Sequence, residues 1–378
     1  MPGINRRDTA NGRLSEARSP IASGERVERI VIYRVGSLGD TVVALPCFHK
    51  LAEAFPNAER YVLTNIPVSS KAAALELILG QSGLIHGVIN YPLKLRSVKE
   101  MWSLSLRLRA LGATTLIYLT PSKGHVIMLF RDLLFFWLSG FSRIIGAPVA
   151  KDVRETRVDP VTGFCEYECS RLARSIAELG PIDLDDPKNW DLRLTGAEQN
   201  AGDQALDAFN GNSFVAINMG GKVIENHWGE GNWRALLRTL SATHGGYGLF
   251  FLGAADEAGA VADIADVWPG IVVNACGKLL PRESAGALRR ASLFIGHDSG
   301  PMHLAAAVGV TCVAPFSGYN RPRKWYPYGA KHRVVQRMDG IMNVPVEEIA
   351  ANVRDVLPAL LAAPGFGVRA ATGRLSSN

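Results

Sequence analysis

The sequence predicts an α/β protein with two doubly wound parallel sheets that follow each other along the chain. Apolar runs that suit strands buried on both faces alternate with amphipathic stretches that suit helices. A Pro- and Asp-rich segment near residue 185 interrupts this alternation, which then begins again. The length of 378 residues exceeds one ordinary core and suits two domains of about 150 residues each.

The first series of elements follows a polar arm. Residues 1–25 contain no apolar run, so they predict a disordered arm and no signal peptide. A strand at Arg29–Val35 leads through the turn GSLGD into a single predicted helix that ends near Pro56. Three later segments are expected to add strands to this sheet, the last of them a short strand or turn: 60–64, 114–119 and 143–148.

The second series repeats the same alternation. Its five predicted strands have the sequences FVAINMG, YGLFFLGA, VVNAC, SLFIGHD and TCVAPF, with a helix between each pair. The chain is therefore divided into an arm, two domains, a last helix and a loose tail: 1–25, 26–185, 186–345, 346–362 and 363–378. Two such domains in series place the carboxyl ends of both sheets around one cleft, where ligands of open α/β sheets bind.

Composition excludes several classes of protein. A hydrophobic content of 47% and a charged content of 20% exclude a disordered chain. The net charge of +6 suits anionic ligands, but no dense Lys/Arg stripe predicts nucleic-acid binding. The stretch Val126–Phe141 is interrupted by Arg131 and Asp132 and is too short to span a membrane, so it is either an ordinary buried helix or a membrane-surface contact.

The cysteines predict a reduced, cytoplasmic protein. All five are scattered along the chain, as expected of small buried thiols and not of a disulfide framework. Cys165 and Cys169 are four residues apart, but no second Cys/His pair lies nearby at the spacing of a zinc site. We therefore expect no metal site.

The segment Ser292–Phe316 carries the strongest local signal. A predicted strand ends at Gly296 and a helix begins at Pro301, with Asp298 or Ser299 as its cap. The free amides from Ser299 through Gly300 to Met302 would then form a site for a diphosphate, and His303 would donate to a phosphate oxygen. Simple capping by Asp298 and Ser299 is the alternative interpretation.

A second signal lies between the first strand and the first helix. Gly36 and Gly39 allow a tight turn, and Asp40 is left at the start of the helix, either as its N-cap or as a group facing the cleft. The loop matches neither the nucleotide-binding G-K-[ST] string nor G-x-G-x-x-G. That mismatch argues against an ATPase and against a dinucleotide-dependent oxidoreductase.

Together these strings resemble glycosyltransferase family 9, the heptosyltransferase family. Its members carry [ND]-[ST]-G-x-M-H-L-A-A-A-x-G followed by a P-Y-G loop, and this chain has DSGPMHLAAAVG at 298–309 and WYPYG at 325–329. The family's opening string R-x-G-x-x-G-D is matched by four residues: Arg34, Gly36, Gly39 and Asp40. The resemblance covers residues 28–362.

The resemblance implies a GT-B fold of two Rossmann-like domains that face a central cleft. The first domain would bind the acceptor and the second the nucleotide diphosphate sugar, with Asp40 as the general base of an inverting, metal-independent transfer without a cofactor. The donor diphosphate would lie against Asp298–His303 and Lys222. Asp256 or Glu257, in the string FLGAADE, would bind a ribose hydroxyl, unless the pair simply forms a solvated helix start.

One departure from the family leaves the sugar open. Asn226 stands where heptosyltransferases often have Lys, although Lys222 lies earlier in the same loop. Heptose from ADP-heptose is therefore one possible donor, and lipopolysaccharide or another surface glycan the expected acceptor, reached by peripheral association with the cytoplasmic face of the inner membrane. A nucleotide-sugar epimerase and a non-catalytic nucleotide-sugar-binding protein are the alternatives.

Overall fold

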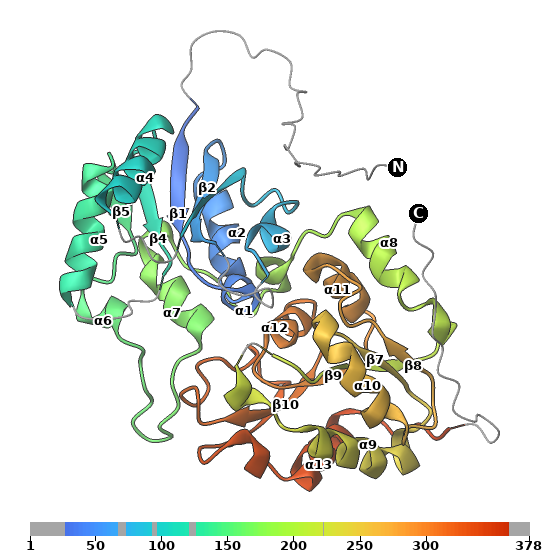
Figure 1. The fold of residues 1–378 in the computed structure, drawn as a ribbon. Helices are drawn as coiled ribbons and strands as arrows, with labels where there is room; N and C mark the ends of the chain where they lie inside the picture. The colour runs from blue at the N-terminus through green and yellow to red at the C-terminus, as the bar shows by residue number, and fades with distance from the viewer. Residues whose placement is uncertain (1–26, 67–72, 93–96, 121–125, 222, 363–378) are drawn as a thin grey trace, which may run out of the picture.

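The computed structural model describes residues 27–66, 73–92, 97–120, 126–221 and 223–362, drawn as the coloured ribbon of Figure 1. The predicted arm at 1–25, the predicted tail at 363–378 and Lys222 lie outside the described residues. Two parallel sheets form the two halves of the molecule: a five-stranded sheet in the order β3-β2-β1-β4-β5, and a six-stranded sheet in the order β11-β10-β9-β6-β7-β8. The α/β, doubly wound fold predicted from the sequence is confirmed.

The first domain is built on β1, whose three central residues are fully buried. Val31 lies beside Tyr61 of β2 on one side and Leu116 of β4 on the other, so that β1 is the middle of the sheet. The strands and helices of this domain are β1 (Arg29–Tyr33), α1 (Leu38–Val42), α2 (Leu45–Ala54), β2 (Glu59–Asn65), α3 (Glu76–Leu79), β3 (Gly87–Tyr91), α4 (Val98–Ala110), β4 (Thr115–Tyr118), α5 (Val126–Leu138), β5 (Arg143–Ile145), α6 (Lys151–Arg154) and α7 (Glu168–Ser175).

The expectation of a single helix after the first turn is wrong. The structure divides it into α1 and α2, with the break at Val43 and Ala44. Pro46 is the reason, because a proline has no N–H to continue the hydrogen-bond ladder and is tolerated only in the first turn of a new helix. The division leaves α1 as a separate short helix at the carboxyl end of β1.

A connection of short 3-10 turns leads into the second domain, in which β6 lies between β7 and β9. The elements are η1 (Ala177–Leu179), η2 (Pro187–Trp190), α8 (Gly196–Gln204), η3 (Asp207–Phe209), β6 (Phe214–Asn218), η4 (Ile224–Asn226), α9 (Glu230–His244), β7 (Gly248–Phe251), η5 (Ala255–Glu257), α10 (Ala258–Ala265), β8 (Val272–Asn274), α11 (Pro281–Leu288), β9 (Leu293–Gly296), α12 (Gly300–Ala307), β10 (Cys312–Ser317), β11 (Arg333–Arg337), η6 (Ile341–Asn343) and α13 (Val346–Val356). The predicted last helix is α13, which ends before Pro358.

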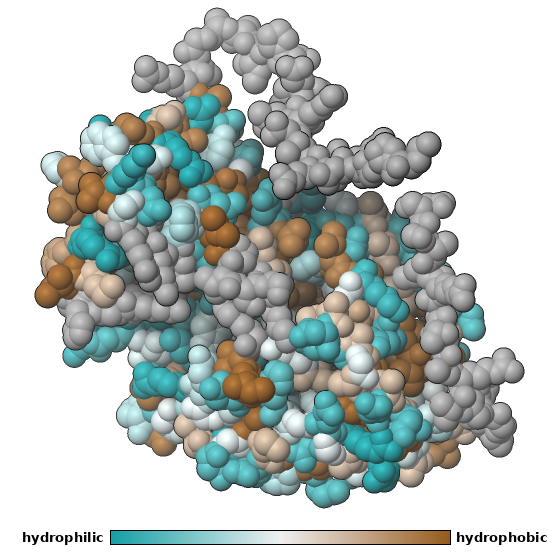
Figure 2. Space-filling view, viewed as in Figure 1, coloured by the Kyte–Doolittle hydropathy of each residue, from teal (hydrophilic) through white to brown (hydrophobic). Residues whose placement is uncertain are grey.

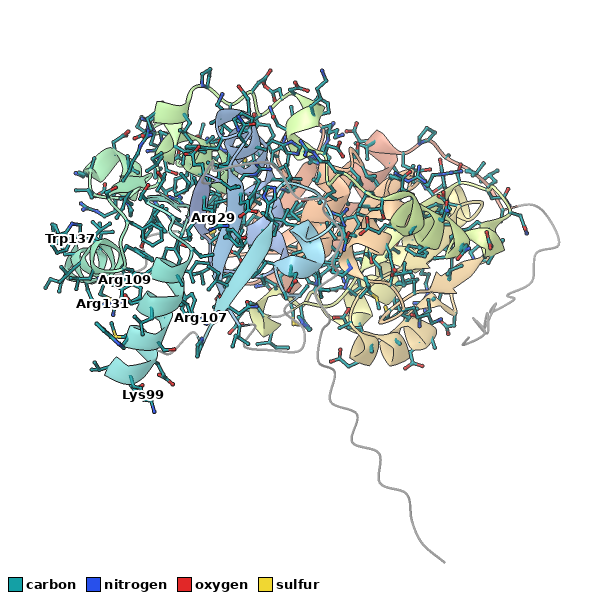
Figure 3. All side chains as sticks on the ribbon, turned by 90° about the horizontal axis from the view of Figure 1, so that it is seen from above. Arg29, Lys99, Arg107, Arg109, Arg131 and Trp137 are labelled. Carbon is teal, nitrogen blue, oxygen red and sulfur yellow. The ribbon has the colours of Figure 1, made fainter. Side chains whose placement is uncertain are left out.

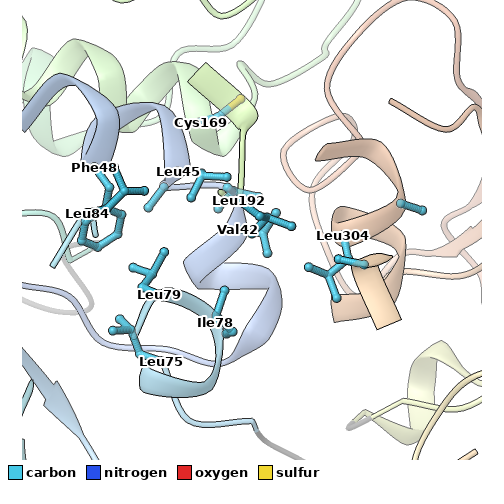
Figure 4. Close-up of a cluster of buried hydrophobic side chains, with 14 of the residues drawn as sticks. Val42, Leu45, Phe48, Leu75, Ile78, Leu79, Leu84, Cys169, Leu192 and Leu304 are labelled. Carbon is cyan, nitrogen blue, oxygen red and sulfur yellow. The ribbon is translucent and has the colours of Figure 1, made fainter. Parts of the chain in front are cut away.

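The two domains share one buried apolar cluster. It runs from the first domain through Val42 to Leu304 of α12, and Figure 4 shows these two side chains from the two domains within the same cluster. Leu192 of the connecting segment belongs to it as well. Because the cluster is continuous, the boundary between the sheets is part of the core and not a solvated joint.

Arg282 of α11 forms hydrogen bonds with residues on both sides of the domain boundary. Its guanidinium donates to the carbonyl oxygen of Ile78 in the first domain at 2.9 Å and to that of Leu192 at 2.8 Å. It also forms a two-pronged ion pair with Glu198 of α8, at 2.6 and 2.8 Å. Only 4% of the Arg282 side chain is exposed, so these bonds are made away from water.

Among the described residues, no helix has the length and apolar character needed to cross a membrane. The apolar stretch that begins at Val126 forms α5, a helix of 13 residues on the outer flank of the first domain.

Candidate active site at the domain interface

The turn after β1 fixes the carboxylate of Asp40. Ser37 is the N-cap of α1 and Asp40 is its third residue, so the expectation that Asp40 is the N-cap is corrected by three positions. The backbone N–H of Ser37 donates to Asp40 Oδ2 at 2.9 Å, and the Ser37 hydroxyl lies 3.2 Å from the same oxygen. Gly36 has a φ of 145°, and a Cβ there would lie 2.3 Å from Asp40 Cβ, so only glycine fits.

Arg34 fixes the backbone of this turn through hydrogen bonds. Its side chain is fully buried and donates to the carbonyl oxygen of Leu119 at 2.6 Å and to the backbone carbonyl of Asp40. Burial lowers the pKa of the Arg34 guanidinium, and the negative charge of Asp40 partly opposes this effect. Arg34 therefore positions the backbone of Asp40, whereas the carboxylate of Asp40 is hydrogen-bonded by Ser37.

α1 packs directly on α12 of the second domain. A Cβ at Gly39 would lie 3.0 Å from His303 Cδ2, and a Cβ at Gly300 would lie 2.6 Å from Leu38 Cδ2. Figure 1 shows the two helices side by side at the centre of the molecule. The two sequence signals, far apart in the chain, therefore meet at one contact, which brings Asp40 next to the start of α12.

His303 lies at this contact as a neutral side chain. Burial lowers its pKa to about 4, with the charge of Asp40 acting in the opposite direction and His332 adding to the decrease. The ring of Trp325, from the WYPYG string, lies edge-on at 6.2 Å between centroids. A neutral imidazole can still donate one hydrogen bond, but it brings no positive charge to the site at pH 7.

The structure confirms Ser299 at the N-cap position of α12 but shows no capping hydrogen bond from its side chain. The helix begins at Gly300, one residue earlier than expected, with Ser299 at the N-cap position. The Ser299 hydroxyl oxygen makes no capping bond and, within the described part of the chain, is buried without a hydrogen-bond partner. The Met302 side chain is fully buried in the core, so only its backbone can serve a ligand. Gly309 ends the helix with a φ of 87°, as predicted.

The carboxylate of Asp298 contacts two side-chain amides. Asn320 Nδ2 donates to Asp298 Oδ2, and Asn226 Nδ2 lies 3.5 Å from this oxygen and 3.4 Å from the Asp298 carbonyl oxygen. Ser317 in turn donates to Asn226 Oδ1 at 2.6 Å. Burial raises the pKa of Asp298 to about 6, the two amides lower it, and the charge of Asp40 raises it further.

This amide cluster is the part of the site that sequence reasoning missed. In the sequence, Asn226 stands out only as a departure from the family, and no motif marks Asn320. The two residues precede and follow Asp298 by 72 and 22 positions, so no local pattern in the sequence indicates their contact.

The carboxyl ends of β6 and β9 form the floor of the site. Asn218 pairs with Gly296, so the loop that follows β6 and the segment that follows β9 leave the sheet side by side. His297 Nε2 lies 2.9 Å from the carbonyl oxygen of Met219, and burial lowers the His297 pKa to about 4. His227 Nε2 lies 3.2 Å from the carbonyl oxygen of Gly221. Both imidazoles thus fix the loop that leads to Lys222.

The structure separates the two acidic candidates of η5. Asp256 is exposed, whereas Glu257 is half-buried against the ends of β6 and β7. A Cβ at Gly220 would lie 1.8 Å from Glu257 Cδ, and one at Gly253 would lie 2.0 Å from Glu257 Oε2. Glu257 therefore lies at the floor of the site, and the absence of side chains at these two glycines makes room for it.

A cavity of about 280 Å³ lies beside α12 where the two domains meet. It is lined by the start of α7, the connecting segment, α12 and the WYPYG loop, and it reaches His303. Aromatic rings form much of its wall, among them Trp190 and Tyr328, which stack at 5.7 Å between centroids.

Comparison with known proteins agrees with this arrangement. Residues 161–343 match the model of glycosyltransferase family 9 (heptosyltransferase). That segment belongs to glycosyltransferase family 9. It contains the loop after β6, α12 and the WYPYG loop. The likeness to the heptosyltransferase family therefore rests on residues 161–343, just under half of the chain.

Solved structures with the same fold span nearly the whole chain. The family 9 glycosyltransferase of Veillonella parvula has a TM-score of 0.67 at 20% identity, covering 89% of this chain and 99% of its own. The ADP-heptose LPS heptosyltransferase II of E. coli has a TM-score of 0.58 at 15% identity, with 87% and 98% covered. E. coli heptosyltransferase WaaC with ADP-2-deoxy-2-fluoro heptose has 0.60 at 14%, with 86% and 99% covered. These likenesses show the GT-B fold. No curated protein sequence matches the chain.

Proposed function

We propose that this glycosyltransferase moves a sugar from a nucleotide diphosphate donor to a hydroxyl group of a lipid-linked or surface glycan, with inversion at the anomeric carbon. The observation that carries the proposal is the contact of α1 with α12. It holds Asp40, from the first domain, beside the start of the helix on which the family's donor signature lies. A base on one domain and a diphosphate site on the other suit attack from opposite faces of the sugar.

Asp40 is the proposed general base. Its Oδ2 is occupied by two hydrogen bonds from Ser37, which hold the carboxylate in one orientation. The acceptor hydroxyl would lose its proton to this carboxylate as its oxygen attacks the anomeric carbon and the sugar–phosphate bond breaks. Arg34 keeps the turn in place through the Asp40 backbone.

The departing nucleotide gains negative charge, which the protein must stabilise. We assign this task to the amides at the start of α12, to Lys222 and to a hydrogen bond from neutral His303. The reaction would then proceed without a divalent cation. Glu257, at the ends of β6 and β7, is the proposed partner of a ribose hydroxyl, and the exposed Asp256 is placed less well for that role.

The donor sugar is expected to make hydrogen bonds with Asp298. Here the carboxylate is held by the neutral amides of Asn226 and Asn320, so that, among the described residues, it is a hydrogen-bond acceptor without a paired cation. E. coli WaaC binds an ADP-heptose analogue, which makes ADP-heptose the first donor to test. The neutral amide at Asn226 makes other nucleotide sugars equal members of the same panel.

Thermal shift with a panel of nucleotide sugars tests donor binding, because a donor at 100 times its dissociation constant stabilises the folded state by about 2.7 kcal/mol. Transfer to a glycan acceptor is then measured with the donor that binds. Asp40→Asn should lower turnover by roughly 10²–10⁴-fold with little change in donor affinity. Asp339→Asn, an exposed carboxylate outside the site, is the control.

Three outcomes would count against the proposal. Equal turnover in Asp40→Asn at saturating donor and acceptor would exclude this base. Conversion of the donor sugar without any acceptor would indicate an epimerase instead. Loss of activity in EDTA that Mg²⁺ or Mn²⁺ restores would contradict a metal-independent reaction.

A further inference from the structure

α5 exposes large apolar side chains on the outer flank of the first domain. Leu129 and Phe136 point inward and are 4% and 3% exposed. Around the rest of the same helix, Ile127, Phe130, Leu134 and Trp137 are 80%, 59%, 55% and 66% exposed. The helix therefore buries one apolar face in its own domain and leaves a second one in water, whereas an ordinary surface helix would be polar there.

α4 continues this surface. Val98, Trp102 and Leu106 follow one another at a spacing of four residues and are 83%, 63% and 49% exposed. The two helices are joined by a 3.0 Å hydrogen bond between the hydroxyls of Ser105 and Ser139. We call the exposed set the α4–α5 apolar face: Val98, Trp102, Leu106, Ile127, Phe130, Leu134 and Trp137. Figure 2 shows hydrophobic groups gathered on this flank of the first domain.

Cationic side chains border the α4–α5 apolar face. Lys99, Arg107, Arg109 and Arg131 all lie on the same two helices, and Figure 3 shows them at one end of the molecule together with Trp137. Asp132 pairs with Arg131 at 2.6 Å, so these two charges offset each other, and Glu100 accepts a hydrogen bond from the N–H of Ser97. Lys99, Arg107 and Arg109 together outweigh Glu100. The border is therefore positive.

From these observations we infer that the α4–α5 apolar face docks the protein on the surface of a bilayer that contains anionic phospholipid. Exposed tryptophans and aliphatic side chains enter the boundary between headgroups and acyl chains, while the cations meet the lipid phosphates. With 13 residues, α5 is too short to span a bilayer and would lie in the interface plane.

A second copy of the chain fits the same surface less well. A symmetric dimer through the α4–α5 apolar face would bring the cationic border formed by Lys99, Arg107 and Arg109 of one copy toward the same border of the other. Like charges brought together repel one another, whereas an anionic bilayer attracts all of them. The inference extends the proposed function, because a lipid-linked acceptor would reach the first domain from that surface.

Sedimentation with vesicles tests the docking surface without any donor or acceptor, so the result does not depend on glycosyl transfer. The full chain is mixed with vesicles of phosphatidylcholine and phosphatidylglycerol, or of phosphatidylcholine alone. Phe130→Ser/Trp137→Ser should lower binding to the anionic vesicles by at least roughly tenfold, because two large apolar side chains are lost from the interface. Met342→Ser, in the second domain and 67% exposed, should bind as the wild type does.

The charge contribution is measured with Lys99→Gln/Arg107→Gln, which should lower binding by roughly fivefold for each cation at low salt and by less at high salt. Brominated phospholipid should quench part of the tryptophan fluorescence, and Trp102→Phe/Trp137→Phe should remove that quenching. Circular dichroism checks that each variant is folded. Unchanged binding by Phe130→Ser/Trp137→Ser would overturn the proposal. So would a wild-type dimer that these substitutions dissociate and that does not bind vesicles.

Discussion

Within the described part of the chain, the Asp298 carboxylate accepts hydrogen bonds from the neutral amides of Asn226 and Asn320 and has no cationic partner. The negative charge of Asp40 raises its pKa further. A buried anion without a cationic partner costs free energy, and the rise of its pKa to about 6 expresses that cost. Residues that bind a ligand often carry such a cost, because the ligand supplies the missing partners.

Asp298→Asn should stabilise the ligand-free protein at pH 8 and weaken transfer. The pKa of Asp298 is raised from 3.8 to about 6, so the native state loses stability as the pH rises through about 6 and is free of this cost below about pH 4. The variant should therefore gain on the order of 1–3 kcal/mol above pH 7, and the gain should vanish near pH 4. Urea unfolding of both proteins at pH 4, 6 and 8 measures it.

Asp263→Asn, an exposed carboxylate of α10, is the matched control and should show no such pH-dependent gain. A stability difference for Asp298→Asn that is the same at all three pH values would mean that Asp298 is not held at a raised pKa.

At the scale of elements, the contact of α1 with α12 depends on two residues without side chains. Gly300 is not in a left-handed conformation, so its role is to let Leu38 approach. Gly39 does the same for His303. Each helix alone is short, five and eight residues, and is stabilised mainly by this packing and by the core beneath it.

Gly300→Ala should weaken transfer and lower stability by about 1–3 kcal/mol, because its Cβ would overlap the Leu38 side chain. The double variant Gly300→Ala/Leu38→Ala removes the overlapping atoms and should recover part of both losses. Steady-state kinetics and thermal unfolding of the single and double variants form the cycle. If the losses of stability and activity in the two single variants simply added in the double variant, the proposed close approach of the two helices would be contradicted.

The elements also show what the sequence could predict. Most of the strands, the tight turn at Gly36 and the end of α12 at Gly309 follow from local patterns, and the structure has them where they were expected. The strands β3 and β11, at the edges of the two sheets, were not predicted. The break before Pro46 was not predicted, because the amphipathic pattern of the sequence continues across it. The sequence alone does not show that Pro46 lies in the first turn of a new helix. The contacts of Asp298 could not be predicted, because they depend on how two distant loops fold over β9 and not on any local spacing.

At the scale of the whole molecule, Arg282 is the polar counterpart of the shared core. Removing it would leave the carboxylate of Glu198 and the carbonyl oxygens of Ile78, Leu192 and Arg193 without their donor. Such groups are expensive when they cannot reach water.

Arg282→Ala should destabilise the protein by about 3–5 kcal/mol, as expected when one partner of a buried ion pair is removed. The wild type should unfold in a single calorimetric transition, because the continuous core couples the two sheets. Arg289→Ala is the control, since its ion pair with Asp203 is 33% and 39% exposed and should matter little. Two resolved transitions in the wild type would show that the domains unfold independently.

The core shared by the two domains limits which domains can be exchanged between related enzymes. A chimera that grafts the second domain onto a foreign first domain would cut through Val42, Leu192 and Leu304 and would separate Arg282 from Ile78. The α1–α12 contact would also lose its complementary shape unless Leu38 travelled with Gly300. The second domain, which carries the proposed donor site, should therefore not fold when it is transferred alone. A chimera that folds would have to take both sides of this domain boundary from the same parent protein.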